Sequence, residues 1–419
     1  MRLGGQTALG AIAIAILTAT SAVAATAPGA LDRSLSRDGK TTLEFGGGAQ
    51  ISDVAVADGR ILAAGFVVRS EGDETGGDEL DIALARLKRD GSLDRSFGNR
   101  GRITTRSGNL AASSVAIQEN GRIVVTSLYG GNFVVMRFLR NGQIDRSFGR
   151  RGKVTTNLGG NDDANSVAIQ RDGRILVAGT SDSSFAAARY RPNGKLDRSF
   201  SEDGTTTTSL AEGSVDEVDM ALQPGGRIVI AGDVGDDFIV ARYRADGRLD
   251  PDFAGDGTQT ADFGARFEFA NAVAANRERI VVAGQRRGPG RDIAIAVFGD
   301  DGNLDGGFSD DGLQTTGFSD RSTDSADAVA IQRDGKVVLV GDTERPGEPS
   351  RMALARYQRD GALDPTFAGD GLKTVTFGKG RRANGSGTAL AIDGRGRLIA
   401  GGLRGGYANG DFALARVLP

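Results

Sequence analysis

Residues 166–208 read SVAIQRDGRILVAGTSDSSFAAARYRPNGKLDRSFSEDGTTTT, and this stretch decides the fold. It contains the apolar segments SVAIQ, RILVAG and FAAARY and then a run of four threonines. The turn sequence RDG lies between the first two segments, and the turn sequence PNG follows the third. Short β-prone segments bounded by Asp-Gly or Asn-Gly indicate antiparallel hairpins. The stretch therefore predicts four strands that follow one another in a meander.

The same unit recurs along the chain. A Leu-Asp or Ile-Asp pair marks each copy at intervals of about 50 to 60 residues, and in six of seven copies a Phe stands three residues after the Asp. The pairs begin at residues 31, 93, 144, 196, 249, 304 and 363, and Leu35 replaces the Phe in the first copy. A four-stranded meander repeated four to eight times is typical of a β-propeller. We predict an all-β, seven-bladed β-propeller of four-stranded antiparallel blades, with residues 25–419 as its single domain.

The chain ends favour a closed ring over the alternative, an open β-solenoid with capping repeats. Residues 40–45 form a fourth-strand element without its own first three strands, and the chain stops just after the third-strand element 412–417. Closing the ring protects sheet edges that a single meander leaves open. We therefore expect the N-terminal strand to pair with the last blade.

The repeated phrases resemble a known family. The patterns L-D-x-x-F-x-x-x-G, V-A-I-Q-x-D-G-[RK]-[IV]-[VL]-V-A-G and F-A-L-A-R-Y are similar to the delta-60 repeats of bacterial proteins, and the resemblance extends from Leu31 to the end of the chain. The resemblance implies a β-propeller of unknown function. It implies no activity, because a fold by itself does not define a function.

The N-terminus has the features of an export signal. Arg2 precedes an apolar run from Ala8 to Leu17, and the small residues Ala22-Val23-Ala24 fit a cleavage site. The apolar run is shorter than the ~20 residues that span a bilayer. We predict a signal peptide at residues 1–24, no membrane span, and a mature protein that is secreted, periplasmic or associated with the cell surface.

The composition excludes several kinds of chemistry. The chain has no His, Cys or Trp, which excludes disulfides, thiol nucleophiles, a Ser–His–Asp triad and the usual zinc sites. Acid–base chemistry would therefore fall to Asp, Glu, Lys or Tyr. With 51 basic and 54 acidic residues, the charge is close to neutral, which argues against nucleic-acid binding.

Two repeated charges have a structural interpretation. The Asp of the marker pair occurs in every copy, and an Arg recurs in the third strand at 86, 137, 189, 242, 356 and 416, with Val297 as the exception. A catalytic site rarely needs so many copies of one residue. We therefore expect an ion pair or a turn cap in each blade.

A binding site is expected on the face whose loops vary. The loops between the second and third strands, and those between blades, differ in length and chemistry, whereas the loops of the opposite face are nearly constant. The candidate binding residues in the variable loops are two tyrosines and five arginines, namely Tyr129, Tyr407, Arg286, Arg287, Arg381, Arg382 and Arg404.

The sequence supports two functional hypotheses. The first is an exported, monomeric, non-catalytic binding scaffold for a protein or glycan partner, with no catalytic residue and no cofactor. The alternative is a calcium-dependent, lactonase-like or other hydrolase that uses carboxylates. Asp53 and Asp219 stand near the start of first strands, but the matching positions in other units hold Ser114, Ser166, Ala272 and Ala328. The acidic turn Asp250-Pro251-Asp252 with Asp256 only distantly resembles a calcium loop.

Overall fold

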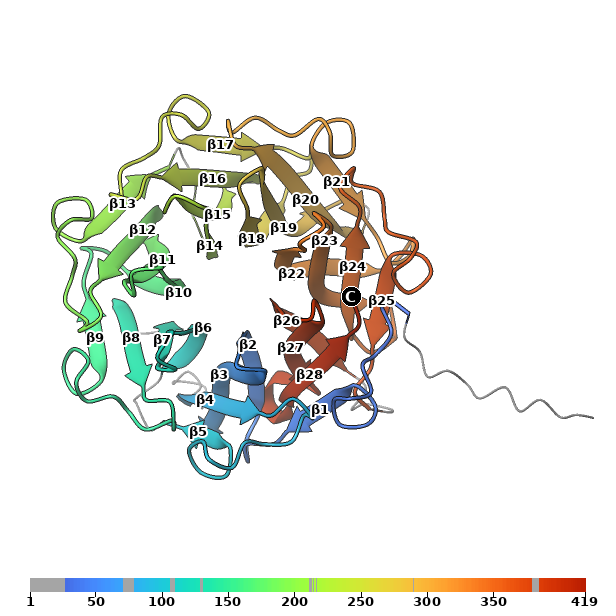
Figure 1. The fold of residues 1–419 in the computed structure, drawn as a ribbon. Helices are drawn as coiled ribbons and strands as arrows, with labels where there is room; N and C mark the ends of the chain where they lie inside the picture. The colour runs from blue at the N-terminus through green and yellow to red at the C-terminus, as the bar shows by residue number, and fades with distance from the viewer. Residues whose placement is uncertain are drawn as a thin grey trace, which may run out of the picture.

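The computed structural model describes residues 27–70, 79–105, 110–128, 131–210, 213, 215, 217–288, 290–378 and 384–419. Four-stranded antiparallel sheets are arranged around a common centre, with their first strands innermost (Figure 1). No helix in the described ranges is long and apolar enough to cross a membrane. The signal-peptide prediction for residues 1–24 lies outside the described residues.

The strands fall into four classes by their order within a repeated unit. The first strands are β2 (Ala49–Ala57), β6 (Ala111–Ile117), β10 (Asp162–Ile169), β14 (Val218–Leu222), β18 (Glu268–Ala275), β22 (Thr323–Ile331) and β26 (Gly385–Ile392). The second strands are β3 (Arg60–Ser70), β7 (Ile123–Leu128), β11 (Ile175–Ser181), β15 (Ile228–Val234), β19 (Arg279–Arg287), β23 (Val337–Glu344) and β27 (Leu398–Arg404).

The remaining strands form the outer half of each sheet. The third strands are β4 (Glu79–Leu87), β8 (Phe133–Phe138), β12 (Ser184–Tyr190), β16 (Asp237–Tyr243), β20 (Arg291–Gly299), β24 (Arg351–Tyr357) and β28 (Asp411–Val417). The fourth strands are β5 (Arg102–Thr104), β9 (Lys153–Thr156), β13 (Thr205–Ser209), β17 (Thr258–Ala261), β21 (Leu313–Thr316), β25 (Leu372–Val375) and β1 (Lys40–Leu43). We number the units by their first strands, from β2 in the first unit to β22 in the sixth, and call the one with β26 the last unit.

Most units form separate sheets. The fifth and sixth units share one eight-stranded sheet, because a parallel pairing of Arg291 with Thr323 joins β20 to β22. Hydrophobic clusters lie between neighbouring units; one of them joins Leu84 and Phe97 of the first unit to Val125 and Phe138 of the second. The repeated Phe residues and Leu35 are fully buried in these clusters, so each unit depends on its neighbour for burial.

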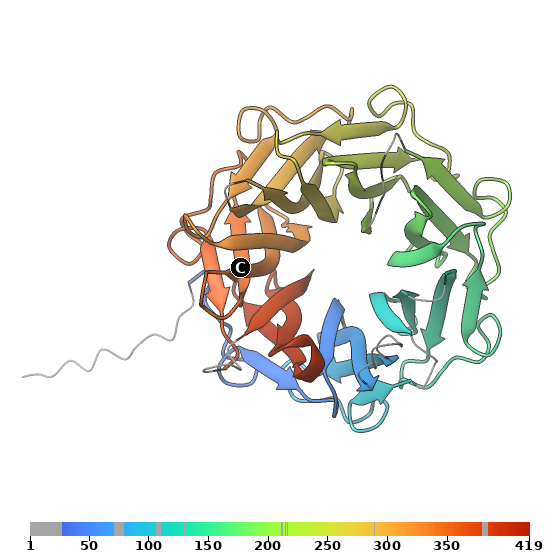
Figure 2. The same cartoon turned by 180° about the vertical axis from the view of Figure 1, so that it is seen from behind.

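The N-terminal strand closes the last sheet, as predicted. β1 pairs antiparallel with β28, from Lys40 opposite Ala415 to Leu43 opposite Phe412. In both views β1 lies beside β28 (Figures 1 and 2). The strand ends two residues before the expected Phe45, whose ring instead packs on Phe412 with centroids 4.6 Å apart.

Residues near the two chain ends together form a turn that one continuous segment forms in other units. The Gly29 N–H donates to the Leu418 carbonyl at 3.0 Å, and the Leu418 N–H donates to the Ala30 carbonyl at 2.9 Å. In the sixth unit the same two bonds link Gln358 with Gly361 and Ala362. The junction between first and last units therefore reproduces the usual turn, with the chain break inside it.

Candidate functional site

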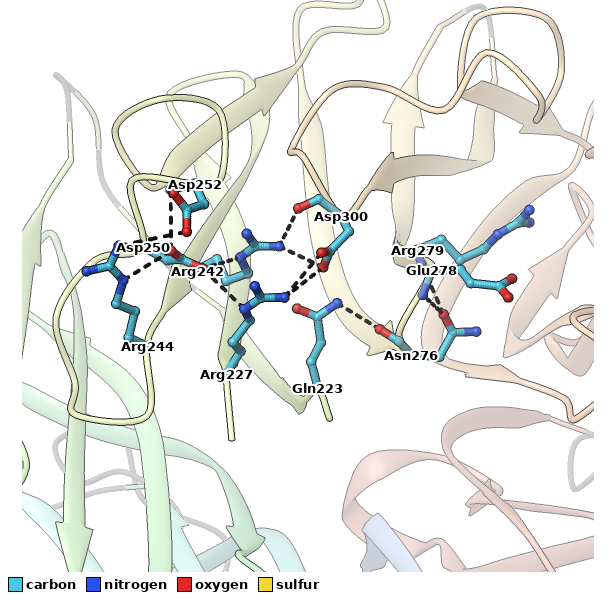
Figure 3. Close-up of polar contacts among 10 residues, drawn as sticks. All are labelled: Gln223, Arg227, Arg242, Arg244, Asp250, Asp252, Asn276, Glu278, Arg279 and Asp300. Carbon is cyan, nitrogen blue, oxygen red and sulfur yellow. Dashed lines mark hydrogen bonds and ion pairs between the residues drawn. The ribbon is translucent and has the colours of Figure 1, made fainter. Parts of the chain in front are cut away.

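The repeated charges form a buried pair that also bridges neighbouring units. In the fourth unit, Arg242 Nε donates to Asp250 at 2.9 Å, and Arg227 approaches the same carboxylate at 3.4 Å (Figure 3). The Arg242 guanidinium lies 4.8 Å from the centroid of the Phe253 ring, and its Nη1 donates to the Asp300 carbonyl of the next unit at 2.5 Å.

The same pair recurs around the molecule. The Arg–Asp contacts are Arg86–Asp94, Arg137–Asp145, Arg189–Asp197, Arg356–Asp364 and Arg416–Asp32, each between 2.8 and 3.0 Å. Where Val297 replaces the Arg, Asp305 is more exposed and pairs with Arg279 at 3.5 Å. The predicted Arg–Asp ion pair is therefore present in every described unit except the fifth, where Arg279 takes the place of the missing Arg.

The acidic turn of the fourth unit is occupied by protein groups. Asp250 contacts Arg242, Arg227 and Arg244, and Asp256 accepts hydrogen bonds from the N–H and hydroxyl groups of Thr258 at 2.8 and 3.0 Å. A carboxylate with several guanidinium partners is a poor calcium ligand, because its charge is already balanced. These contacts favour turn chemistry for the Asp-rich loops.

A cavity of about 530 Å³ lies at the centre, where the first strands begin. Every unit contributes to its wall. The polar side chains that line it are Gln50, Ser52, Asp53, Ser113, Ser114, Asn165, Glu217, Asp219, Asn271, Asp327 and Thr388. Four of these are acidic, and none of the described lining residues is basic.

A β-bulge explains why so many polar side chains reach the cavity. The pairing of most first strands with their second strands shifts by one residue. The shift lies at Ser52, Asn165, Asn271, Asp327 and Thr388, and in the second unit at Ser113 and Ser114 together. An extra residue interrupts the alternation of side chains along a strand and re-aims the one it inserts. All these inserted residues line the cavity.

Several bulge side chains also join adjacent units. Ser113 donates to the Ala164 carbonyl at 2.6 Å, and Asn271 donates to the Ala326 carbonyl at 3.0 Å. Thr388 makes the same bond to the carbonyl of Ile51 at 2.5 Å, between the last unit and the first. The cavity wall is therefore also part of the ring's closure.

Two carboxylates at the next position bind backbone of neighbouring units. Asp53 accepts bonds from the Ser114 hydroxyl at 2.9 Å and from the Val115 N–H at 2.8 Å. Asp219 accepts a bond from the Val273 N–H at 2.9 Å. Burial raises the pKa of both carboxyls, that of Asp53 to about 6, although their hydrogen bonds act in the opposite direction.

A second acidic group lies on the sixth unit. The Ser325 hydroxyl lies 2.9 Å from Asp327 and 3.0 Å from Asp342, and Asn271 donates to Asp327 at 3.2 Å. One hydroxyl donates only one hydrogen, so both contacts are hydrogen bonds only when a carboxyl is protonated. Burial, and then the Asp342 charge, raises the pKa of Asp327 to about 7.

The sequence identified this site only in part. Asp53 and Asp219 line the cavity at the expected register, and Ser114, Ala272 and Ala328 line it at the matching positions, so this register holds no continuous ring of acidic residues among the described residues. The bulge brings Asn271 and Asp327, the residues directly before those alanines, into the wall. Strict alternation of side chains along the strand does not predict these two residues in the cavity wall, and the bulge has no clear signal in a single sequence.

The predicted binding residues are spread along the variable loops. Tyr407, which is 44% exposed, packs on Phe66 of the cavity wall, with centroids 5.4 Å apart. Arg404 bonds to Asp411 within the last unit. Arg286 donates to the carbonyl of Phe263, and Arg287 lies over the ring of Phe267. Among the described candidates, only Tyr407 is shown to contact a residue of the cavity wall, Phe66, and Tyr407 itself does not line the cavity. Tyr129, Arg381 and Arg382 lie outside the described residues.

Another acidic group lies away from the central cavity. Asp237, Asp262 and Glu268 each have a carboxylate oxygen within 4.8 Å of the others. Glu268 already accepts bonds from the N–H groups of Phe263 and Ala265, at 3.0 Å each. Asp324 of the sixth unit accepts a similar bond from the Phe318 N–H at 2.9 Å. Glu268 and Asp324 therefore each hold the loop that leads into the first strand of their own unit.

Comparisons with known proteins agree with the architecture. A family model described as a domain of unknown function (DUF5122) β-propeller matches residues 57–97, 118–148, 170–200, 223–253 and 332–367. No curated protein matches the chain.

The chain is also similar to solved structures. The structure of YCF48 bound to D1 peptide is 13% identical, with a TM-score of 0.52, 94% of this chain covered and 98% of that one. Virginiamycin B lyase from Staphylococcus aureus, in a catalytically inactive form with quinupristin, is 8% identical, with a TM-score of 0.48 and coverages of 90% and 98%. The chain therefore has a β-propeller fold, and five of its segments match the model of the DUF5122 β-propeller domain.

Proposed function

We propose that this chain is an exported, monomeric, seven-bladed β-propeller of delta-60-type repeats that acts as a non-catalytic binding protein. The strand classes and the sequence repeats support seven blades, and the N-terminal apolar run supports export. The binding surface is the variable-loop face around the central cavity. The observation that carries this proposal is a polar cavity of about 530 Å³ with an exposed aromatic side chain at its edge.

The cavity chemistry indicates a basic partner. Asp53, Glu217, Asp219 and Asp327 give the wall an acidic character without a basic lining residue among those described. Tyr407, on the wall residue Phe66, offers an apolar face with a polar edge, as contact residues often do. We therefore propose a polypeptide that inserts a Lys or Arg side chain into the cavity and packs an apolar group against Tyr407.

Selection of displayed peptides on the mature protein tests this function. We expect enriched peptides to contain Lys or Arg, and we expect Y407A and D327N each to weaken a chosen peptide about tenfold, roughly the loss of one good contact. D334N, which changes an exposed aspartate in a turn of the constant face, is the matched control and leaves the affinity unchanged. Enrichment of peptides without basic residues, or full affinity in both Y407A and D327N, contradicts the proposal.

The same peptide should bind in a pH-dependent way. Asp327 has a pKa of about 7 and is surrounded by Asn271, Ser325, Asp342 and Glu217. A cationic side chain binds the ionised carboxylate, so affinity falls as the pH is lowered from 8 to 5.5 and the carboxyl takes up a proton. Calorimetric Kd values at the two pH values measure the effect, and D327N should reduce it. An affinity that rises at pH 5.5 contradicts an acidic binding cavity.

A further inference from the structure

The loops that join third to fourth strands share one frame but differ in charge around the ring. Each contains a nine-residue segment that begins with the Leu-Asp or Ile-Asp pair, and we call this segment the marker loop. Apart from the repeated Asp, the marker loops that begin at residues 31, 93 and 144 hold seven arginines and one acidic residue. The other four, in the third to sixth units, hold one arginine and seven acidic residues. The basic and acidic residues are therefore separated into two groups of units.

The three basic loops are neighbours on the rim of the ring. They precede β1, β5 and β9, the outermost strands of the last, first and second units (Figure 1). The Ser36 N–H donates to the Asp90 carbonyl of the first unit at 2.9 Å, and the Gly98 N–H donates to the Asn141 carbonyl of the second at 2.8 Å. We call the seven exposed arginines of these loops the basic arc, namely Arg33, Arg37, Arg95, Arg100, Arg146, Arg150 and Arg151.

The side chains of the basic arc have no partner within the protein. None of them makes an ion pair or a side-chain hydrogen bond in the part of the chain that the structure describes. The repeated arginines of the third strands differ in this respect, since each is paired with a marker-loop Asp. The guanidinium groups of the arc are therefore free to bind an anion from solution.

Two arginines of the arc stand where the other units have a turn-capping aspartate. The residue before the last Gly of the marker loop is Asp in five units, and its carboxylate accepts a hydrogen bond from the N–H two residues later. In the first and second units this residue is Arg100 or Arg151, with positive φ values of 54° and 55°. Such a backbone favours Gly, Asn or Asp, so Arg loses the cap and adopts a disfavoured conformation. A residue that departs from local preference in this way is a candidate for function.

A groove of about 920 Å³ lies beside Arg100, at the junction of the last, first and second units. Arg100 and Arg102 line it, and Glu44 is the one acidic residue among the described lining residues. The other lining residues are Phe45, Gly98, Asn99, Ile103, Thr104 and Gly142. The groove thus combines two guanidinium groups with amide, hydroxyl and apolar surface. This combination suits a segment that carries both hydroxyl and acidic groups.

The composition of the arc narrows the class of partner. A guanidinium binds a carboxylate or a sulfate through two parallel hydrogen bonds. Ile144 is the only large apolar side chain exposed in the three described basic loops, whereas the interface with a folded protein has an apolar centre. A flat anionic membrane along this face would also meet the acidic loops of the fourth to sixth units, which repel it. A flexible anionic chain can follow the basic loops alone.

We infer that the basic arc binds a linear anionic polysaccharide. Its carboxylate or sulfate groups pair with arginines of three consecutive units, and one of its segments occupies the groove beside Arg100. The arc lies on loops of the constant face, opposite the variable loops. The inference concerns a second surface and does not depend on the proposed peptide-binding function.

Calorimetric titration of the mature protein with polygalacturonate, dextran sulfate and neutral dextran tests the inference. We expect at least one of the two anionic chains to bind and dextran not to bind. Binding should be weaker at about 150 mM than at about 20 mM NaCl, because salt screens exposed charges. Equal binding of dextran, or absence of binding by both anionic chains at the lower salt concentration, overturns the inference.

A charge-reversal variant tests the two arginines at the turns. R100D/R151D introduces the aspartate that the other five units have at this position, so the melting temperature should be kept. We expect it to weaken binding about tenfold, roughly the loss of two exposed ion pairs. R277D/R333D is the matched control, because it makes the same change in charge at exposed arginines of the fifth and sixth units. The control leaves the affinity unchanged, whereas equal affinities of the two variants overturn the inference.

Two further measurements identify other partners of a basic surface. Vesicles that contain phosphatidylglycerol test for a membrane, and sedimentation of the protein alone tests for a second copy, whose acidic loops could contact the arc. Binding to the vesicles without binding to either anionic chain assigns the arc to a membrane surface. Self-association that R100D/R151D abolishes, without binding to either chain, assigns it to an interface between copies. Either result overturns the inference.

Discussion

At the scale of single residues, the repeated Arg acts through several contacts at once. The Arg242 side chain is 1% exposed; it pairs with Asp250, stacks on Phe253 and donates to the carbonyl of Asp300 in the next unit. A buried ion pair adds little by itself, but removal of one partner leaves the other poorly compensated. The sequence predicted the pair from its repetition, but not the bond to the next unit, because that partner is a backbone carbonyl and no residue type reveals it.

We therefore expect R242V to lower the free energy of unfolding by about 3 kcal/mol. The matched control is R140A, which removes the ion pair of Arg140 with Asp58 at 2.8 Å, whose side chains are 62% and 68% exposed. That exposed pair should contribute less than about 1 kcal/mol. The midpoints of urea denaturation measure both effects. Equal midpoints for the two variants would show that the repeated pair does not hold the units together.

At the scale of strands and turns, the alternation of residues predicts the elements but not the detail of the first strands. In the third unit, the expected strands at 174–179, 185–190 and 205–208 correspond closely to β11, β12 and β13. The first strand was expected from Ser166 but begins at Asp162, before the bulge at Asn165. Apolar residues indicate which face of a strand packs in the core. The polar residue inserted by a bulge faces the cavity, and the hydropathy pattern does not predict its position.

The bulge bonds between units should contribute to stability. T388V removes the hydroxyl that donates to the Ile51 carbonyl and keeps the side-chain shape, so we expect a loss of about 1 to 2 kcal/mol. T374V, at an exposed position of β25, is the control and should change the free energy by less than about 0.5 kcal/mol. Thermal melts compare the two. If T388V melts at the temperature of T374V, the contact between Thr388 and Ile51 does not stabilise the junction of the last and first units.

At the scale of the whole molecule, the central cavity depends on closure of the ring. The central cavity has a wall from every unit only when the last unit meets the first. Three features make that contact: pairing of β1 with β28, the bond from Arg416 to Asp32 at 2.8 Å, and the turn rebuilt from Leu418 and Gly29. The repeats predicted this closure, because one fourth strand stands at the start of the chain and one is missing at its end.

Scanning calorimetry of three chains tests closure most directly: residues 27–419, residues 47–419, and a permutant in which residues 28–46 follow Pro419. The permutant carries P28D, because proline is disfavoured at the third position of such a turn. We predict one cooperative transition for residues 27–419, a melting temperature lower by on the order of 10 °C for residues 47–419, and full recovery in the permutant. An unchanged melting temperature for residues 47–419, or a permutant as unstable as that chain, would contradict a ring closed by its N-terminal strand.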